Sequence, residues 1–266
     1  MNAPPRRVTK TTLFQMKQRG DKIVMLTAYD FAMAHLLDQA GTDVLLVGDS
    51  LGMVVQGHET TIPVTLGQMI YHGRMVARAA CRAMVVVDLP FPHGQLGVRA
   101  TLQVAARILK QTGCQAVKLE GGAQQSETIQ ALVSAGIPVI AHVGMRPKGV
   151  HALGGYRVQR DADRLLHDAR AAESAGAFCI LMECVPTKLA QDVTSTLQVP
   201  TIGIGAGPHC DGQVLVTNDV LGLTLGKVPR FVRQQVDLSS QITTAISYHN
   251  RAVRDGTFPN QSESFE

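Results

Sequence analysis

The run DVLLVGDS, Asp43 to Ser50, joins an uninterrupted apolar stretch to an abrupt polar ending. Residues 44–47 are all Val or Leu, a pattern typical of strands covered on both faces, as parallel strands are in α/β proteins. Gly48, Asp49 and Ser50 follow at once, although a loop there would need only soluble side chains. The run therefore predicts a buried parallel strand that ends at a functional carboxylate, that of Asp49.

The same pattern recurs along the chain as short apolar runs bounded by Gly or Pro. Ala-rich segments of helical character separate most of the runs, at 31–41, 98–113 and 163–176, and each ends on a glycine suited to a left-handed helix cap. Repeated strand and helix units without a second composition regime favour a single (β/α)8 TIM barrel. The predicted strands are residues 22–29, 43–49, 83–89, 115–121, 138–144, 178–184, 200–206 and 213–219.

The segment GIGAG, residues 203–207, argues against an open doubly wound sheet. It lacks the GxGxxG spacing of a dinucleotide-binding turn, and Pro208 follows where a phosphate-binding helix would begin. We expect residues 1–266 to form one barrel domain with flexible termini at about 1–10 and 256–266. A first helix is expected from a capping box at Thr12 and Gln15 to a stop at Gly20, and a C-terminal helical tail from Ser239 on.

Composition excludes several classes of function. The net charge is +4, but the basic residues are scattered and aromatic residues make up only 4% of the chain, which disfavours nucleic-acid binding. The five cysteines are odd in number and form no CxxC pair, so neither a zinc site nor a disulfide framework is expected. We therefore expect the protein to lie in a reducing compartment. No apolar run reaches the roughly 18 residues of a membrane span. We expect a cytoplasmic protein without a membrane segment.

Polar side chains end five of the predicted strands. Each alone has an ordinary interpretation, since an Asp after a strand is usually a turn former and a lone His in an apolar strand is usually a core residue. Their coincidence changes this interpretation, because the carboxyl ends of barrel strands are where active sites form. The residues are Asp49, Ser50, Asp88, Lys118, Glu120, His142 and Glu183.

The spacing of these residues points to a metal. Lys118 and Glu120 lie two apart on one strand and so face the same side. Asp49 and Asp88 end neighbouring strands, about 4.8 Å apart in backbone, where two carboxylates repel unless a cation lies between them. Oxygen ligands without a thiolate or a His pair favour Mg²⁺, which leaves positions open for water and substrate. Asp49 is therefore predicted to be a metal ligand.

A Mg²⁺ ion with open positions suits a 2-oxo acid, whose adjacent carboxylate and keto oxygens can both bind it. Such binding stabilises the enolate formed when the neighbouring carbon loses a proton. Lys118 and Ser50 are placed to hold the carboxylate. Glu183 ends the sixth strand, across the barrel mouth from the metal, which is a suitable place for the base that takes the proton.

From Thr11 to Phe265 the chain resembles the ketopantoate hydroxymethyltransferase (3-methyl-2-oxobutanoate hydroxymethyltransferase) family. The runs GDSLGM and GIGAG are especially specific. The ordered matches are MLTAYD (25–30), LLVGDSLGMVVQGHETTIPVT (45–65), VDLPF (87–91), VKLEGG (117–122), AHVGMRP (141–147), HALGGYRVQ (151–159), ECVP (183–186), IGIGAG (202–207) and CDGQVLV (210–216).

The resemblance implies a Mg²⁺-dependent barrel of the phosphoenolpyruvate/pyruvate type. Such an enzyme transfers the one-carbon unit of 5,10-methylenetetrahydrofolate to 3-methyl-2-oxobutanoate, giving 2-dehydropantoate on the way to pantothenate and coenzyme A. It is usually a cytoplasmic homo-oligomer, often a decamer. In the family pattern Asp49, Asp88 and Glu120 fall at metal positions; Asp49, Ser50, Asp88 and Lys118 at substrate positions; and Glu183 at the catalytic proton acceptor, with His142 a candidate substrate contact.

The chain departs from the family pattern at three places: Pro92-His93-Gly94, Arg160 and Asn218. All are expected in loops or near the last strand's end, which leaves the metal set intact. Two alternatives stay open. One is a Mg²⁺-dependent carbon–carbon lyase of the same barrel type acting on a 2-oxo acid, and the other is a diverged duplicate without catalytic activity.

Overall fold

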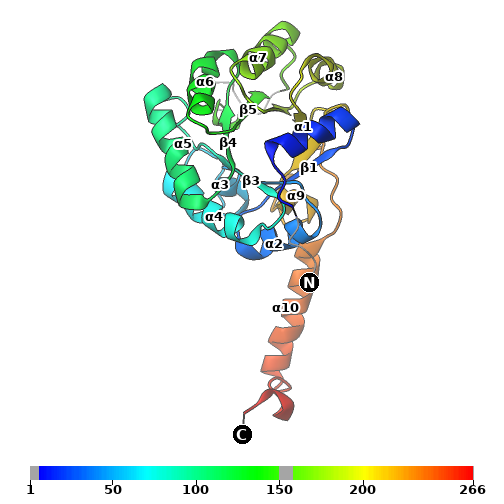
Figure 1. Ribbon diagram of the computed structural model, residues 1–266. Coiled ribbons are helices and arrows are strands. Elements are labelled where there is room, and N and C mark those ends of the chain that lie inside the picture. Colours follow the sequence, from blue (N-terminus) through cyan, green and yellow to red (C-terminus); the bar gives the residue numbers. More distant parts are fainter. Residues whose placement is uncertain (1–5, 150–157, 266) are drawn as a thin grey trace. The chain divides into compact units, whose positions relative to one another are not determined.

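The computed structural model describes residues 6–149 and 158–265. Eight parallel strands pair in sequence order, and β8 pairs with β1 to close a barrel (Figure 1). The predicted (β/α)8 fold is confirmed. The strands are β1 (Ile23–Thr27), β2 (Val44–Val47), β3 (Met84–Asp88), β4 (Ala116–Glu120), β5 (Val139–Gly144), β6 (Cys179–Glu183), β7 (Thr201–Ile204) and β8 (Gly212–Leu215).

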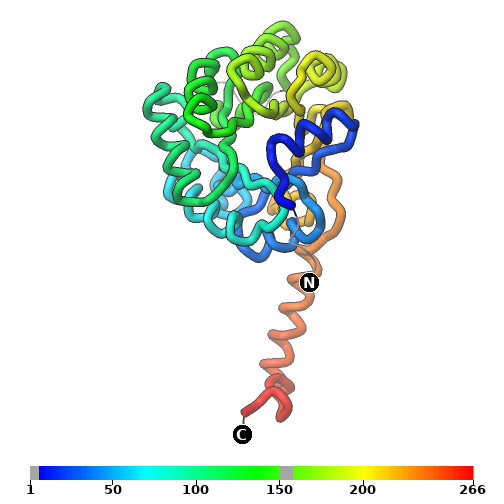
Figure 2. The backbone as a smooth tube through the Cα atoms, in the orientation of Figure 1, coloured from blue at the N-terminus to red at the C-terminus, as the bar shows by residue number. Residues whose placement is uncertain are grey.

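Helices surround the barrel wall, as Figures 1 and 2 show. The glycines expected to end the helical segments do so, because Gly41, Gly113 and Gly176 all have positive φ angles. In the described ranges, no helix combines the length and apolar character needed to cross a membrane. The helices up to residue 216 are α1 (Lys10–Arg19), α2 (Phe31–Gln39), α3 (Leu51–Val54), α4 (Leu66–Ala79), α5 (Val98–Thr112), α6 (Ser126–Ser134), α7 (Ala162–Ser174) and α8 (Thr187–Thr196), with 3-10 turns η1 (Ala123–Gln125) and η2 (Pro147–Gly149).

The apolar residues of the strands form two layers because side chains on a strand alternate between its faces. Met84 and Val86 of β3 belong to the cluster inside the barrel. Their neighbours Val85 and Val87 belong to the larger cluster between the wall and the helices. Both faces of β3 are therefore buried, which explains why its sequence is continuously apolar.

The N-terminal segment differs from expectation. Helix α1 begins at Lys10 and is capped by Thr9, whose side chain accepts a hydrogen bond from Thr12 N, so the predicted cap at Thr12 is wrong by three residues. The stop at Gly20 is confirmed. The described part of the expected flexible terminus is anchored, since Val8 is buried with the inner cluster and the Arg7 guanidinium donates to Ala80 O at 2.6 Å. The apolar residue Val8, which lies among basic residues in the sequence, holds this segment against the barrel.

Contacts group the chain into two compact units, one ending at Val216 and one beginning at Thr217, where a single domain was expected. The second unit contains α9 (Thr217–Val220), α10 (Leu238–Arg254) and the turn η3 (Gln261–Glu263). The last predicted strand was therefore too long, because its polar end forms α9 instead. The expected C-terminal helix is α10, which begins within one residue of the predicted position.

Asp38, near the end of α2, fastens the chain that enters β3. Its buried carboxylate accepts hydrogen bonds from the backbone N–H groups of Cys81, Arg82 and Ala83, the shortest at 2.6 Å from Ala83. Burial alone raises the pKa of Asp38, but these three donors outweigh it and the pKa is lowered. The charged form of Asp38 is thus the one that stabilises this junction.

We predict that Asp38→Asn lowers the free energy of unfolding at pH 7 by about 1–3 kcal/mol, because one of the two acceptor oxygens becomes an NH2 donor and no longer satisfies a backbone N–H. Because the folded-state pKa is depressed, the difference from wild type is full above about pH 4 and shrinks as the pH falls through the folded pKa. Urea unfolding at several pH values measures it. Asp163→Asn, at an exposed helix position, is the control and should stay within about 0.5 kcal/mol of wild type. An Asp38→Asn variant as stable as wild type would contradict the stabilising role of the Asp38 carboxylate.

Candidate active site

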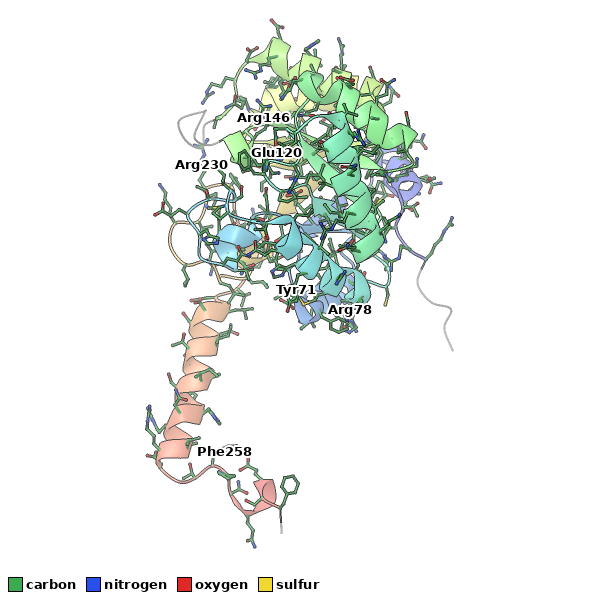
Figure 3. All side chains as sticks on the ribbon, turned by 90° about the vertical axis from the view of Figure 1, so that its left-hand side faces the viewer. Tyr71, Arg78, Glu120, Arg146, Arg230 and Phe258 are labelled. Carbon is green, nitrogen blue, oxygen red and sulfur yellow. The ribbon has the colours of Figure 1, made fainter. Side chains whose placement is uncertain are left out.

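The polar residues predicted from the strand ends occupy inward-facing positions at one end of the barrel. Asp88 follows the inward Met84 and Val86 in the alternation of β3, and Lys118 and Glu120 follow Ala116 on β4. Strand register sets Asp88 beside Lys118 and Glu120 beside His142. Figure 3 shows Glu120 within the barrel, while Tyr71 and Arg78 lie on the outer helix α4. The alternation therefore delivers these side chains to one place.

Gly48 explains how the turn after β2 approaches its neighbours. A Cβ atom at this position would lie 2.8 Å from Ser50 Oγ, closer than atoms pack, so a larger residue would displace Ser50. Asp49 N donates to Asp88 Oδ2 at 3.2 Å, which brings the predicted metal carboxylates together. Ser50 Oγ forms a 2.8 Å hydrogen bond with the hydroxyl of Tyr29.

Tyr29, at the end of β1, was not predicted as a site residue. Burial, the largest cause, raises the pKa of its hydroxyl, and the charges of Asp88 and Asp49 act in the same direction. The hydroxyl therefore stays protonated and fixes Ser50. His72 of α4 contacts the carbonyl oxygen of Tyr29 through Nδ1 at 2.6 Å. The run TAYD carried no signal for this role, because Tyr29 reads as an apolar core residue.

Lys118 and Asp88 form a buried ion pair. Lys118 Nζ lies 2.6 Å from Asp88 Oδ1, and the two side chains are only 6% and 2% exposed. Burial strips both groups of water, so each is stable there only with its partner. The pairing offsets the desolvation free energy of the charged lysine inside the barrel. It also links the end of β3 to β4.

Lys148 is a second site residue that was not predicted from the sequence. It belongs to η2, after β5, yet its Nζ lies 3.0 Å from Asp49 Oδ2 and 3.1 Å from Glu120 Oε1. Its backbone N–H donates to Glu120 Oε2 at 3.3 Å. Burial by itself lowers the pKa of Lys148, but the charges of Asp49 and Glu120 outweigh it and the pKa is raised. The sequence RPKG suggests an exposed turn, so nothing in it marks a buried lysine.

Glu183 and His142 form the other part of the site. His142 Nε2 lies 3.2 Å from Glu183 Oε2, and the Glu183 side chain is 15% exposed, more than the carboxylates around Lys148. Burial is the main cause that lowers the pKa of His142, which keeps its ring neutral at pH 7. A neutral imidazole can still donate one N–H. In this structure Nε2 makes no well-aligned hydrogen bond, so His142 lies beside the Glu183 carboxylate without being bonded to it.

The backbone around Glu183 is specialised. Gly144 of β5 pairs with Glu183 of β6. A Cβ atom at Gly144 would lie 2.5 Å from Glu183 O, so the two strands can approach this closely because position 144 is a glycine. Cys184 follows in a left-handed conformation with φ 51°, unusual for a residue other than glycine. Backbone strain of this kind gathers at functional sites. The turn at Cys184 ends β6 abruptly after the Glu183 carboxylate.

The predicted metal carboxylates come to one end of the barrel, but two ammonium groups lie among them. Asp88 pairs with Lys118, and Asp49 and Glu120 pair with Lys148. The described residues hold no group of three or more Asp, Glu, His or Cys side chains placed to bind one metal ion. Mg²⁺ in proteins often takes only one or two carboxylates, so a smaller set is sufficient for it.

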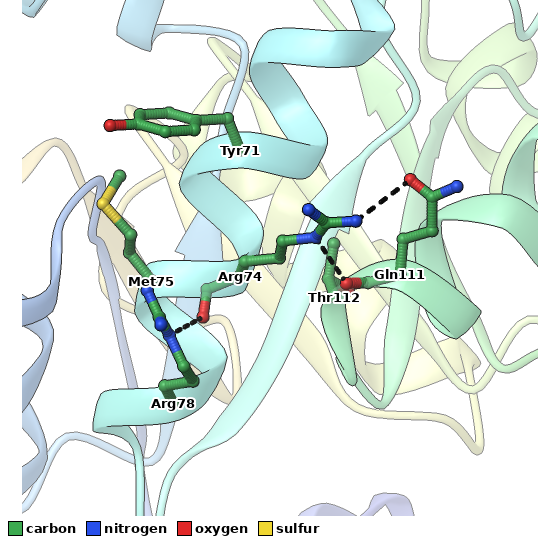
Figure 4. A pocket seen from close by; sticks show the side chains of 6 residues that line it. All are labelled: Tyr71, Arg74, Met75, Arg78, Gln111 and Thr112. Carbon is green, nitrogen blue, oxygen red and sulfur yellow. Dashed lines mark hydrogen bonds between the residues drawn. The ribbon is translucent and has the colours of Figure 1, made fainter.

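Other regions of interest lie away from this cluster. A surface pocket between α4 and α5 is lined by Tyr71, Arg74 and Gln111 among others, and Arg74 Nε donates to Gln111 O at 2.9 Å (Figure 4). It contains no carboxylate and belongs to the outer helices. Of the departures from the family pattern, Pro92 to Gly94 lie in the turn after β3 and Arg160 just before α7. The segment 151–159 lies outside the described residues except for its last two.

Comparisons with known proteins agree on one family. The family model for ketopantoate hydroxymethyltransferase matches residues 7–261. A 3-methyl-2-oxobutanoate hydroxymethyltransferase of Rhodopirellula baltica is 58% identical over 260 residues, which cover 98% of this chain and 97% of the relative. One of Desulforapulum autotrophicum is 52% identical, with 98% and 99% covered. The similarity therefore spans the whole barrel and the C-terminal unit.

Solved structures share the fold at low identity. Phosphonopyruvate hydrolase, solved in complex with oxalate and Mg²⁺, superposes with a TM-score of 0.62 at 14% identity, covering 96% of this chain and 92% of that one. A 2,3-dimethylmalate lyase of the PEP mutase/isocitrate lyase superfamily gives 0.61 at 18% identity, with 98% and 93% covered. These likenesses support the barrel type alone.

We predict that Asp88→Leu and Lys118→Met each lower the free energy of unfolding by about 3–5 kcal/mol, because each leaves a buried charge unpaired. The double variant should lose clearly less than the sum, since neither charge remains. Urea unfolding of the three variants gives the coupling.

The control is the exposed pair Lys188 and Asp192, 2.8 Å apart, for which the same cycle should give a coupling of at most about 1 kcal/mol. Additive losses at Asp88 and Lys118 would show that the two charges do not depend on each other.

Proposed function

The chain belongs to the ketopantoate hydroxymethyltransferase family, and on that premise we propose that it converts 3-methyl-2-oxobutanoate, 5,10-methylenetetrahydrofolate and water to 2-dehydropantoate and tetrahydrofolate, the water supplying the new hydroxyl oxygen. The observation that carries the proposal is the joint placement of Asp49, Asp88 and Lys118 on one side of the barrel mouth and Glu183 on β6. Relatives 46–58% identical carry the name of this activity.

We propose further that Asp49 and Asp88 hold a divalent cation, Mg²⁺ being the natural choice for oxygen donors. Glu120, the third predicted ligand, would add its negative charge nearby, because the described residues hold no group of three such side chains placed around one ion. The local chemistry fits. Asp49 Oδ2 is buried and makes no well-aligned hydrogen bond among the described residues. Asp49 N already bonds to Asp88, which keeps the two carboxylates adjacent. A bound cation would supply electron withdrawal from the oxo group, which makes the neighbouring C–H bond more acidic.

The other residues bind the substrate and move its proton. Ser50, fixed by Tyr29, and Lys118, fixed by Asp88, offer donors to the carboxylate of the oxo acid. Glu183, which lies beside His142, accepts the proton from C3 of the substrate, and C3 then forms the new bond to the one-carbon unit. His142 itself is also a candidate substrate contact, because neither of its ring nitrogens has a hydrogen-bond partner among the described residues.

Neither alternative is favoured. The lyase named above shares the fold at 18% identity, whereas the hydroxymethyltransferases share up to 58% along the whole length. A duplicate without activity would not need to keep buried charges such as Asp49, Asp88 and Glu120, since each costs free energy unless it is paired.

We also propose that the protein works as a cytoplasmic homo-oligomer, with a decamer as the family expectation. Large apolar side chains are exposed on the outer helices, including Phe31 and Leu36 on α2 and Tyr71 on α4. Clusters of this kind often mark contacts between subunits. The five cysteines, all within the described residues, form no disulfide, in keeping with a reducing compartment.

We predict that Asp49→Ala weakens Mg²⁺-dependent binding of 3-methyl-2-oxobutanoate at least about tenfold, because a ligand of the cation is lost. Lys148 keeps Glu120 as partner, so the fold should survive. Calorimetric titration with and without Mg²⁺ measures the effect, and Asp163→Ala serves as the matched surface control. Unchanged affinity in Asp49→Ala would remove the metal assignment.

Wild-type protein with Mg²⁺ should exchange the C3 proton of 3-methyl-2-oxobutanoate with solvent and form 2-dehydropantoate when the folate is added. Glu183→Gln should bind the oxo acid as wild type does but exchange that proton about 10²–10⁴ times more slowly, because the base is gone. Proton NMR in D₂O follows the exchange. A folded wild-type enzyme without product would refute the proposed function, and rapid exchange in Glu183→Gln would refute the role of Glu183.

A further inference from the structure

The ammonium group of Lys148 lies between the carboxylates of Asp49 and Glu120. It is 3.0 Å from Asp49 Oδ2 and 3.1 Å from Glu120 Oε1, and its side chain is 4% exposed. Reaching these atoms from a loop after β5 requires the stem of the lysine to point into the barrel mouth. Lys148 is thus a buried cation at a place that the proposed function reserves for another cation.

The two cations compete for the same oxygen atoms. A divalent ion bound to Asp49 Oδ2 would approach to about 2.0–2.1 Å and would repel an ammonium already in contact with that oxygen. Asp49 has no well-aligned hydrogen bond at Oδ2 among the described residues, so the Lys148 contact is electrostatic and gives way without breaking a directed bond. The second contact is a 3.1 Å hydrogen bond from Lys148 Nζ to Glu120 Oε1, and the same repulsion opposes it.

Charge balance points the same way. The three carboxylates of Asp49, Asp88 and Glu120 face two ammonium groups, those of Lys118 and Lys148. In the substrate-free site, a divalent ion together with Lys118 balances these carboxylates without Lys148. Lys118 keeps its 2.6 Å bond to Asp88, while Lys148 becomes surplus.

We propose that Lys148 is an internal counter-ion of the carboxylate cluster, which neutralises Asp49 and Glu120 in the metal-free protein and must leave them for the divalent cation to bind. This inference rests on the proposed cation site and adds to it. Lys148 is a positioning residue in this scheme, because it keeps the carboxylates paired before the cation arrives and weakens the cation's apparent affinity.

Direct titration of the substrate-free protein with Mn²⁺, followed by electron paramagnetic resonance of the free ion, tests the proposal without any activity assay. Lys148→Gln should bind Mn²⁺ at least about tenfold more tightly than wild type, which is about 1.4 kcal/mol. Lys148→Arg, which keeps the charge, should stay near wild type. Lys188→Gln removes an equal charge from an exposed position and is the matched control, with unchanged affinity expected.

A measurement on the wild type keeps the test independent of how the variants fold. Amine acetylation followed by mass spectrometry should show Lys148 labelled several-fold faster with Mg²⁺ than without it, while the exposed Lys188 is labelled equally. Equal Mn²⁺ affinity in wild type and Lys148→Gln, or unchanged labelling of Lys148, would overturn the inference and leave the proposed function standing. Absence of Mn²⁺ binding in both proteins would overturn the cation site and the inference together.

Discussion

Charge balance in a buried place is the constraint on which the site depends. The inner positions at the carboxyl ends of β3 and β4 carry Asp88, Lys118 and Glu120 where solvent hardly reaches. A charge there is stable only beside an opposite one, so each carboxylate is found with an ammonium group. The rest of the barrel interior is filled by apolar side chains from the inward-facing positions of the same strands, and their packing keeps the strands in register. Packing thus sets the geometry, and the charges determine what that geometry binds.

Much of this could be predicted from the sequence because it follows from local periodicity. Continuous apolar runs identified all eight strands, and the spacing of two between Lys118 and Glu120 identified the inward face. Loops carry no such periodicity, which is why Lys148 went unnoticed: its burial depends on how the segment after β5 folds back to the mouth. The same limit explains the misplaced start of α1, where Thr9 and Thr12 are equally good caps on paper.

In the proposed function, the residues that bind the substrate lie apart from the residue that takes its proton. Asp49, Asp88 and Lys118 lie on consecutive parts of the wall, while Glu183 lies on β6 with His142 as its neighbour. The carboxylates therefore lie in two different surroundings, which fits the two roles that we propose for them, holding a cation and taking a proton. Family membership supplies the identity of the substrates, and the residues of this chain supply the reasons why such a substrate fits.

A crystal structure with Mg²⁺ and 3-methyl-2-oxobutanoate tests the central claim most directly. We expect the ion bonded to Asp49 and Asp88, the oxo acid on the ion with its carboxylate toward Ser50 and Lys118, Glu183 facing C3, and Lys148 displaced from Asp49. An oxo acid bound elsewhere, or bound in this place while Lys148 still bridges Asp49 and Glu120 and no ion is present, would contradict it.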